Sequence, residues 1–451
     1  MLQKTNWFFL LVLLNSWTWA QKRTFSLEEA RNYGLENRKS MTIADLDVLT
    51  AQKQVLEVTA QGLPQISADG TFQQYLNVPT TVAPATFINP NASPDDLIAF
   101  QLATTYSAIG SLNASQLLFD GSYFVGLQVA KHVAEFAALN KQQVAWDVQY
   151  QITQAYFNVL VAEANVQILD SIVQSTELLF RKMESMRSIG LAEQQEVDQM
   201  EMNFTRSKAM LNNARRMHKV SLNMLKMQMG YPYEQDLALD SDLSDYMNRV
   251  ILEYGELKSS VEQNMQLILL AKRKEISEYE LKNTKFVHFP QLSAFFQHQY
   301  MGFRNEFDFF RNGDWFPATA WGVSLKIPIF SGGMRYARMQ QAKIDVMKRE
   351  EEIEETKRML QFQEIRLIQD FESAIDQLRI EEKNVALAMR IYNNVSVKKN
   401  IGTSSTLDVT QAYSQVLTAQ TEYIRACSTL LNTKSELDNL YGNFNQIIEA
   451  K

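Results

Sequence analysis

The strongest constraint in this sequence is that its parts occur twice in the same order. LPQISADGTFQQY begins at Leu63 and FPQLSAFFQHQY begins at Phe289, with their prolines 226 positions apart. Further pairs follow at separations of 211 and 212, namely FDG with FSG at Phe119 and Phe330, and SIGLAEQQEVDQ with NIGTSSTLDVTQ. A repeat on this scale predicts one structural design used twice, in residues 21–240 and 241–443.

The repeat separation changes because the first half carries an insertion. About 15 extra residues fall within NVPTTVAPATFINPNASPDDLIAF, which holds four of the nine prolines. Proline with Asn, Asp and Ser interrupts helix and strand, so residues 77–105 are predicted to form a loop. This loop either plugs an outer mouth or is a surface loop without a function of its own.

Each half contains two predicted strands, at about 64–77 and 107–119, and at about 290–301 and 319–330. In the last of them, Trp321, Val323, Leu325, Ile327 and Ile329 alternate with smaller or polar residues. Period-two patterning predicts strands with one apolar face. Strands of about ten residues match the ~9–11 residues of a transmembrane β-strand, although a soluble sandwich fits the strands alone equally well.

Long helices make up the rest of each half. Apolar residues step by four and three from Val148 through Met183, and a matching seam starts at Leu360, interrupted by Glu364 and Glu381. This is a sustained heptad, typical of helices that pack side by side. A helix from residue 122 to 188 would measure roughly 100 Å, far more than a bilayer core of ~30 Å. Gly190 and Gly402 are predicted to turn each helical pair into a hairpin.

Composition points to an exported chain. Lys4, the apolar run from Trp7 to Leu14 and the small residue Ala20 are typical of a secretory signal peptide in residues 1–20. The single cysteine, Cys427, excludes an internal disulfide. Without Lys4 the formal charge is −8, which disfavours nucleic acid as a partner. Residues 444–451 are expected to form a C-terminal tail.

Four strands do not complete a membrane structure. A sheet in lipid must close without an edge, and the smallest membrane barrels have eight strands. Copies of the chain must therefore pool strands, two copies giving eight and three giving twelve. The polar candidates for a barrel lumen are Gln65, Ser67, Asp69, Gln291, Ser293, Ser324 and Lys326.

The chain resembles the outer membrane efflux protein family, the TolC-like channels. The features that carry the resemblance are the signal peptide, the duplicated plan, the proline joints between helix and strand, and the turn glycines, each followed six residues later by Glu-Val or Asp-Val. The resemblance implies an α+β fold of mainly long α-helices. In it, a homotrimer pools four strands per chain into a 12-stranded β-barrel, continued by an α-helical coiled-coil tunnel across the periplasm. It also implies the outer membrane of a Gram-negative bacterium, contact with outer membrane lipid, and an exit duct for an RND or ABC inner-membrane transporter joined through a periplasmic adaptor (membrane fusion) protein.

The resemblance further implies an aperture where the hairpins turn, ringed by acidic residues. The family's acidic position, six after the turn glycine, matches Glu196 and Asp408. A second acidic position of some members falls on Gln411, so this chain departs there from the pattern of a double acidic ring. We expect charged or polar contacts near Glu196, Lys398 and Lys399 to favour the closed state, with Gln195 also at the aperture. The expected adaptor-contact tips are Ile189, Gly190, Leu191, Ala192, Ile401, Gly402, Thr403 and Ser404.

The sequence offers no constellation for catalysis, and we expect no enzyme activity, cofactor or metal. Its histidines, at 132, 218, 288 and 298, do not have metal-ligand spacing. For Glu196 and Asp408, the alternative to an aperture role is a carboxylate that stabilises the start of a helix. Two alternative functions also stay open, a type I protein secretion outlet of the same fold and a soluble periplasmic coiled-coil scaffold.

Overall fold

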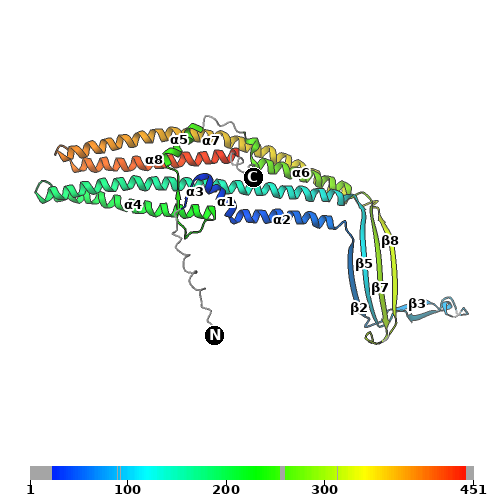
Figure 1. The fold of residues 1–451 in the computed structure, drawn as a ribbon. Coiled ribbons are helices and arrows are strands. Elements are labelled where there is room, and N and C mark those ends of the chain that lie inside the picture. Colours follow the sequence, from blue (N-terminus) through cyan, green and yellow to red (C-terminus); the bar gives the residue numbers. More distant parts are fainter. Residues whose placement is uncertain (1–22, 89, 92, 254–259, 312, 443–451) are drawn as a thin grey trace, which may run out of the picture. The chain divides into compact units, whose positions relative to one another are not determined.

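The computed structural model describes residues 23–442, except 89, 92, 254–259 and 312 (Figure 1). These residues form two compact units. Unit 1 comprises Ala137–Ala271 and the described parts of Met1–Val48 and Glu351–Lys451; unit 2 comprises Leu49–Phe136 and Lys272–Glu350. Each unit draws on both halves of the sequence, so the units do not coincide with the predicted repeats. The predicted signal peptide and C-terminal tail lie outside the described residues.

Unit 2 contains a four-stranded antiparallel sheet in the order β2-β5-β7-β8 (Figure 1). The strands are β2 (Gln65–Gln74), β5 (Tyr106–Asp120), β7 (Gln291–Arg304) and β8 (Trp315–Lys326). All four predicted strands are therefore present and pair in one sheet. The end strands β2 and β8 each have a neighbour on one side only within the described chain.

The last strand lies earlier in the sequence than predicted. The expected range was 319–330, but β8 begins at Trp315 and ends at Lys326. Pro328 explains the early end, because proline has no N–H to donate and restricts the residue before it. The apolar alternation at Ile327 and Ile329 therefore continues beyond the strand.

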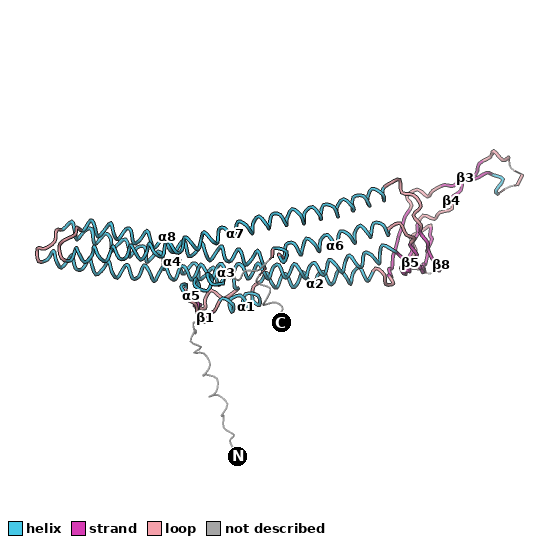
Figure 2. The backbone as a smooth tube through the Cα atoms, turned by 90° about the horizontal axis from the view of Figure 1, so that it is seen from above, coloured by secondary structure: helices cyan, strands magenta, loops and turns pink. Residues whose placement is uncertain are grey.

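The insertion in the first half is not the irregular loop that its prolines predicted. It contains strands β3 (Thr80–Pro84) and β4 (Leu97–Gln101), paired antiparallel, with the short 3₁₀ helix η1 (Ala85–Phe87) between them. Pro84 is compatible with this hairpin because it ends a strand of a two-stranded sheet, where a missing N–H is tolerated. Figure 2 shows the hairpin extending away from the four-stranded sheet.

The strand register gives the sheet one polar and one apolar face. Directly paired residues lie on the same face, and Gln65 pairs with Ser115, Asn113 with Gln297, and Ser293 with Ser324. The seven residues predicted for the lumen all share the polar face: Gln65, Ser67, Asp69, Gln291, Ser293, Ser324 and Lys326. The apolar face carries Ile66, Phe72, Leu292, Phe296, Trp321, Val323 and Leu325.

Eight α-helices lie within the described residues. Four of them continue from one unit into the other: α2 (Lys39–Ala60), α3 (Gly121–Ser188), α6 (Met265–Phe286) and α7 (Met334–Asn400). Unit 1 also holds α1 (Leu27–Asn37), α4 (Gln194–Met229), α5 (Leu243–Glu253) and α8 (Thr406–Tyr441). Helices at corresponding positions in the order of the two halves have nearly equal lengths, 68 and 67 residues for α3 and α7, and 36 each for α4 and α8.

Helix packing in unit 1 follows the predicted heptad seams. Ile152, Val159 and Phe371 are fully buried in one hydrophobic cluster, and Leu169 and Val409 belong to a second. Burying a side chain of this size contributes about 1.5–3 kcal/mol. The short strands β1 (Arg23–Phe25) and β6 (Leu237–Leu239) pair parallel beside these helices, and the 3₁₀ helix η3 (Val261–Gln263) precedes α6.

Glu381 interrupts the second seam but is nevertheless buried. Gln377 Nε2 donates to its Oε1 at 2.6 Å, and Asn384 Nδ2 donates to its Oε2 at 3.0 Å. These local bonds satisfy the carboxylate, which would otherwise be costly at such a position. Throughout the described residues, no helix has a stretch that is long and apolar enough to cross a membrane.

Candidate functional site

The hairpins α3–α4 and α7–α8 of unit 1 turn with the same backbone geometry. Gly190 and Gly402 have φ angles of 79° and 77°. Gly190 N donates to Arg187 O and Leu191 N donates to Met186 O, both at 2.9 Å, and the same two bonds close the turn at Gly402 at 2.9–3.0 Å. This is the Schellman motif, which satisfies the last helical carbonyls and favours glycine. The predicted turns at both glycines are confirmed.

A capping box begins the helix after each turn. Ser405 Oγ accepts from Asp408 N at 3.1 Å, and Asp408 Oδ2 accepts from Ser405 N at 2.9 Å. At the first turn, Glu193 takes the place of Ser405, and Glu196 Oε2 accepts from Glu193 N at 3.4 Å. Glu196 and Asp408 therefore both stabilise the start of a helix, as the alternative interpretation of these carboxylates required.

Glu196 also joins the two hairpins. Its Oε1 accepts hydrogen bonds from Lys399 Nζ, at the end of α7, and from Thr406 Oγ1, at the start of α8, the latter at 2.6 Å. The Lys399 side chain is 16% exposed and that of Glu196 is 27% exposed. We call Glu196, Lys399 and Thr406 the tip clamp, because they connect turns that lie more than 200 residues apart in sequence.

The clamp and the helix cap fix the charge of the two carboxylates. The Lys399 ammonium and the Thr406 hydroxyl hold the pKa of Glu196 below its ordinary value, against the opposing effect of burial. The pKa of Asp408 is lowered by the Ser405 backbone N–H and by the hydroxyls of Ser405 and Ser404. Lys399 balances the charge of Glu196, whereas Asp408 is exposed and has no basic ion-pair partner among the described residues, so Asp408 is the member of this pair that presents a negative charge to solvent.

The remaining aperture candidates lie outside the tip clamp. Lys398, Gln195 and Gln411 are exposed. The carbonyl of Lys398 accepts from the Thr403 N–H and, at 3.2 Å, from the Thr403 hydroxyl. Of the sequence-predicted set, the structure thus brings Glu196 and Lys399 into contact.

The predicted tips form an exposed apolar surface. Ile189, Leu191 and Ile401 are each about 70% exposed, whereas Ala192 is partly buried against the helix core. Gly190, Gly402 and Thr403 are exposed and Ser404 is partly exposed. Large apolar side chains grouped at a turn are typical of a protein contact surface.

Sequence reasoning missed Thr406 and Leu407 at the same tip. Thr406 is buried beneath Glu196, whereas Leu407 is 64% exposed and extends the apolar surface. The run Ser405-Thr406-Leu407-Asp408 is itself a capping-box signature and could have located the helix start. The long-range contact of Thr406 with Glu196 has no such local signal.

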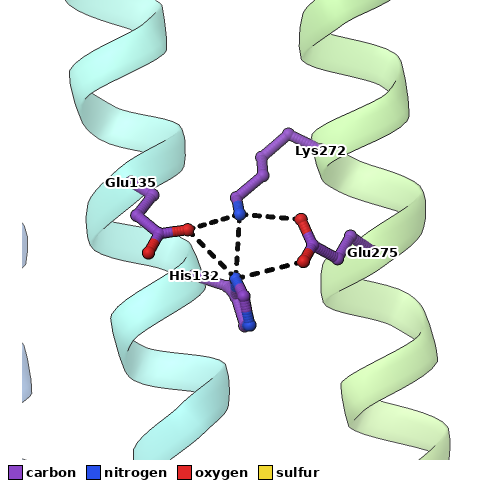
Figure 3. Close-up of polar contacts among 4 residues, drawn as sticks. All are labelled: His132, Glu135, Lys272 and Glu275. Carbon is purple, nitrogen blue, oxygen red and sulfur yellow. Dashed lines mark hydrogen bonds and ion pairs between the residues drawn. The ribbon is translucent and has the colours of Figure 1, made fainter.

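A second polar cluster lies between α3 and α6 in unit 2 (Figure 3). Lys272 Nζ donates to Glu135 Oε2 at 2.5 Å and to Glu275 Oε2 at 2.7 Å, and it lies 2.8 Å from His132 Nδ1. The carboxylates raise the pKa of Lys272 against burial, and hydrogen bonding to Lys272 lowers the pKa of Glu135. We call these four residues the α3–α6 brace. No group of three or more His, Cys, Asp and Glu side chains in the described chain is arranged to hold a metal ion.

Comparison with known proteins agrees with this fold. Residues 259–443 match the model of the outer membrane efflux protein family. The chain is 20% identical to the outer membrane protein TolC of Vibrio cholerae over 302 residues, covering 67% of this chain and 69% of TolC. It is 23% identical to the proteases secretion protein PrtF of Dickeya chrysanthemi over 226 residues, covering 49% of this chain and 47% of PrtF.

A solved structure extends the likeness to nearly the whole chain. The structure of CusC has a TM-score of 0.71 with 15% identity, covering 92% of each chain. Residues 259–443 thus resemble the outer membrane efflux protein family, and the described residues share the fold of CusC. The resemblance seen in the sequence is thereby confirmed.

Proposed function

We propose that this chain forms an outer membrane exit duct as a homotrimer. The observation that carries the proposal is the four-stranded sheet, which has one polar face, one apolar face and two end strands that, within the described residues, each pair on one side only. In lipid such edges must be paired, and copies of the same chain supply the missing neighbours if β8 of one copy pairs with β2 of the next. The apolar face then meets lipid and the polar face lines the lumen.

Three copies give twelve strands, the number that the family resemblance implies. We further propose that each half of the chain is a copy of one design, which supports pseudo-equivalent α3–α4 and α7–α8 hairpins around the tunnel. The near-equal helix lengths and the identical turns at Gly190 and Gly402 support this view.

In this proposal the hairpin tips form the periplasmic aperture and the tip clamp holds it closed. Glu196 bonds Lys399 and Thr406 only while the two hairpins stay together, so the contact favours one packing of the helices over a more open one. The exposed Ile189, Leu191 and Ile401 are suited to a periplasmic adaptor that connects an inner-membrane transporter of the RND or ABC type. The partner transporter chooses the cargo.

The test of location is fractionation of cells that express the chain. The proposal expects the mature protein in the outer membrane fraction, resistant to extraction with salt and alkali. Recovery in the soluble periplasmic fraction would instead support the coiled-coil scaffold.

A second candidate is a polypeptide secretion outlet, favoured by the likeness to PrtF. It uses the same duct with a different transporter. Expression of the chain in a strain that lacks its own outlet separates the two functions, because restored protease export supports secretion and restored drug resistance supports efflux.

A further inference from the structure

The repeated phrase Pro-Gln-x-Ser contributes to a single cavity in unit 2. Gln65 comes from the first copy of the phrase, and Gln291 and Ser293 come from the second. The cavity lies where the strands leave their helices, against the polar face of the sheet, and has a volume of about 580 Å³. That size falls within the range of small-molecule sites, ~300–1,000 Å³.

The cavity wall is polar but almost uncharged. Asp120 is the only charged residue among the described residues that line it. Its Oδ1 is already engaged, because Ser122 N and Ser122 Oγ donate to it at 2.8 and 2.6 Å. Five amide side chains dominate the remainder: Gln61, Gln65, Gln116, Asn283 and Gln291.

Some of these amides hold the joint together and still offer acceptors. Gln65 Nε2 donates to Ala60 O at 2.8 Å, and Gln116 Nε2 donates to Gly62 O at 2.6 Å. Among the described residues only the Nε2 atoms of these two side chains form hydrogen bonds, so their Oε1 atoms can accept from a solute. Asn283 Oδ1 is buried and has no hydrogen-bond partner among the described residues, which is costly for a polar atom unless a water or a solute reaches it.

We propose that this cavity is a binding subsite for an uncharged solute rich in hydroxyl groups, such as a sugar. Amides that both donate and accept match hydroxyl groups, and the ring of Tyr123 supplies an apolar wall. An anionic solute would lose its hydration without gaining a counter-charge, and a cationic one would find only Asp120, whose Oδ1 already accepts from Ser122. The choice of a passing solute as occupant rests on the proposed function, since it requires the polar face to line the lumen.

The test uses purified protein in detergent with sucrose as the probe, measured by saturation-transfer NMR. Gluconate and glucosamine serve as anionic and cationic comparators. The wild type is expected to bind sucrose in preference to both. Gln291→Glu keeps the size of the side chain but adds a charge, and should weaken sucrose binding roughly tenfold while it favours glucosamine.

Gln65→Glu, the same change in the other copy of the phrase, should have the same effect. Gln297→Glu is the matched control, because Gln297 lies on the same strand and the same face but does not line the cavity. Circular dichroism and size-exclusion elution establish that each variant is folded.

Absence of sucrose binding in the wild type would overturn the proposal, as would equal effects of Gln291→Glu and Gln297→Glu. Because binding is measured in detergent, its failure is separate from a failure of the duct. A chain that conducts but does not bind sucrose would contradict this subsite alone, and one that binds without conducting would contradict the duct alone.

Discussion

At the residue scale, Glu196 combines a helix cap with a bond between hairpins, so its ionisation controls both. Its pKa is lowered in the folded state, and a carboxylate of this kind stabilises the fold at pH values above its ordinary pKa of 4.5. The contribution is lost as the pH falls through the lowered folded-state pKa. We therefore expect the ion pair of the tip clamp to weaken as the pH falls through this folded-state pKa.

This gives a first prediction for the clamp. Glu196→Gln should remove an ion pair that contributes up to ~1 kcal/mol, and the variant should lose stability less steeply than wild type below pH 4.5. The measurement is thermal unfolding of both proteins across an acid pH series. Parallel pH profiles for the two proteins would show that Glu196 is not linked to the acid transition.

Burial lowers the reactivity of the Cys427 thiol. The thiol is fully buried in the core of unit 1, and burial raises its pKa to about 11. Because the thiolate is the reactive form, we expect a thiol reagent at pH 7.5 to label Cys427 at least ~100-fold more slowly in the folded protein than in denaturant. Labelling at similar rates in the two conditions would contradict the burial of this helix face.

At the element scale, Gly402 and Gly442 both have left-handed backbone conformations, but they differ in the space around a Cβ. Comparing their alanine variants therefore distinguishes the cost of backbone strain from the cost of a steric clash. Gly402 has a positive φ, but a Cβ there would meet open space, whereas a Cβ on Gly442 would lie 2.3 Å from the Trp146 ring. Gly402→Ala should therefore cost about 1–2 kcal/mol from conformation alone, and Gly442→Ala should cost more. Denaturant unfolding of both variants measures which one loses more free energy of unfolding. Equal losses would mean that the Trp146 ring moves away from a new Cβ at position 442 without cost.

The α3–α6 brace contributes to the stability of the fold within a range of pH set by the titration of Glu135 and Lys272. Glu135, with its lowered pKa, stabilises the fold above pH 4.5, and Lys272, with its raised pKa, stabilises it below pH 10.5. Lys272→Met should therefore lower the melting temperature most between these limits. The difference between variant and wild type should shrink at both extremes, and a difference that does not depend on pH would show that Lys272 acts through packing alone.

Local patterns predicted the elements better than their long-range contacts. Heptad seams, turn glycines and the polar side of each strand follow from spacing along the chain, and the structure has all of them. The β3–β4 hairpin was missed because four prolines outweighed the short apolar runs around Val82 and Ile98. The bond between Glu196 and Lys399 joins positions 203 apart, and only the strand register brings Gln65 and Gln291 to one cavity.

At the scale of the whole molecule, the proposed duct needs a neighbouring copy to pair the end strands β2 and β8 of the sheet. The test uses a chain in which Cys427 is replaced by serine. In it, Thr71→Cys on β2 is combined with a second cysteine on β8, at Ala318, Ala320 or Gly322. The cysteine on β2 of one copy should form a disulfide with the cysteine on β8 of the next copy. All of these positions lie on the polar face. The proposed trimer predicts a covalent ladder that ends at three chains on denaturing gels, and a ladder that ends at two would contradict it.

Closure of the aperture by the tip clamp is the central claim, and conductance in a planar bilayer tests it most directly. Purified wild-type protein should give small, cation-favouring current steps, since Asp408 presents a negative charge to solvent. Glu196→Gln and Lys399→Ala should each enlarge the steps, while Asp408→Asn should mainly reduce cation preference. Unchanged steps in both clamp variants, with the protein inserted and trimeric, would contradict a closed state held by Glu196 and Lys399.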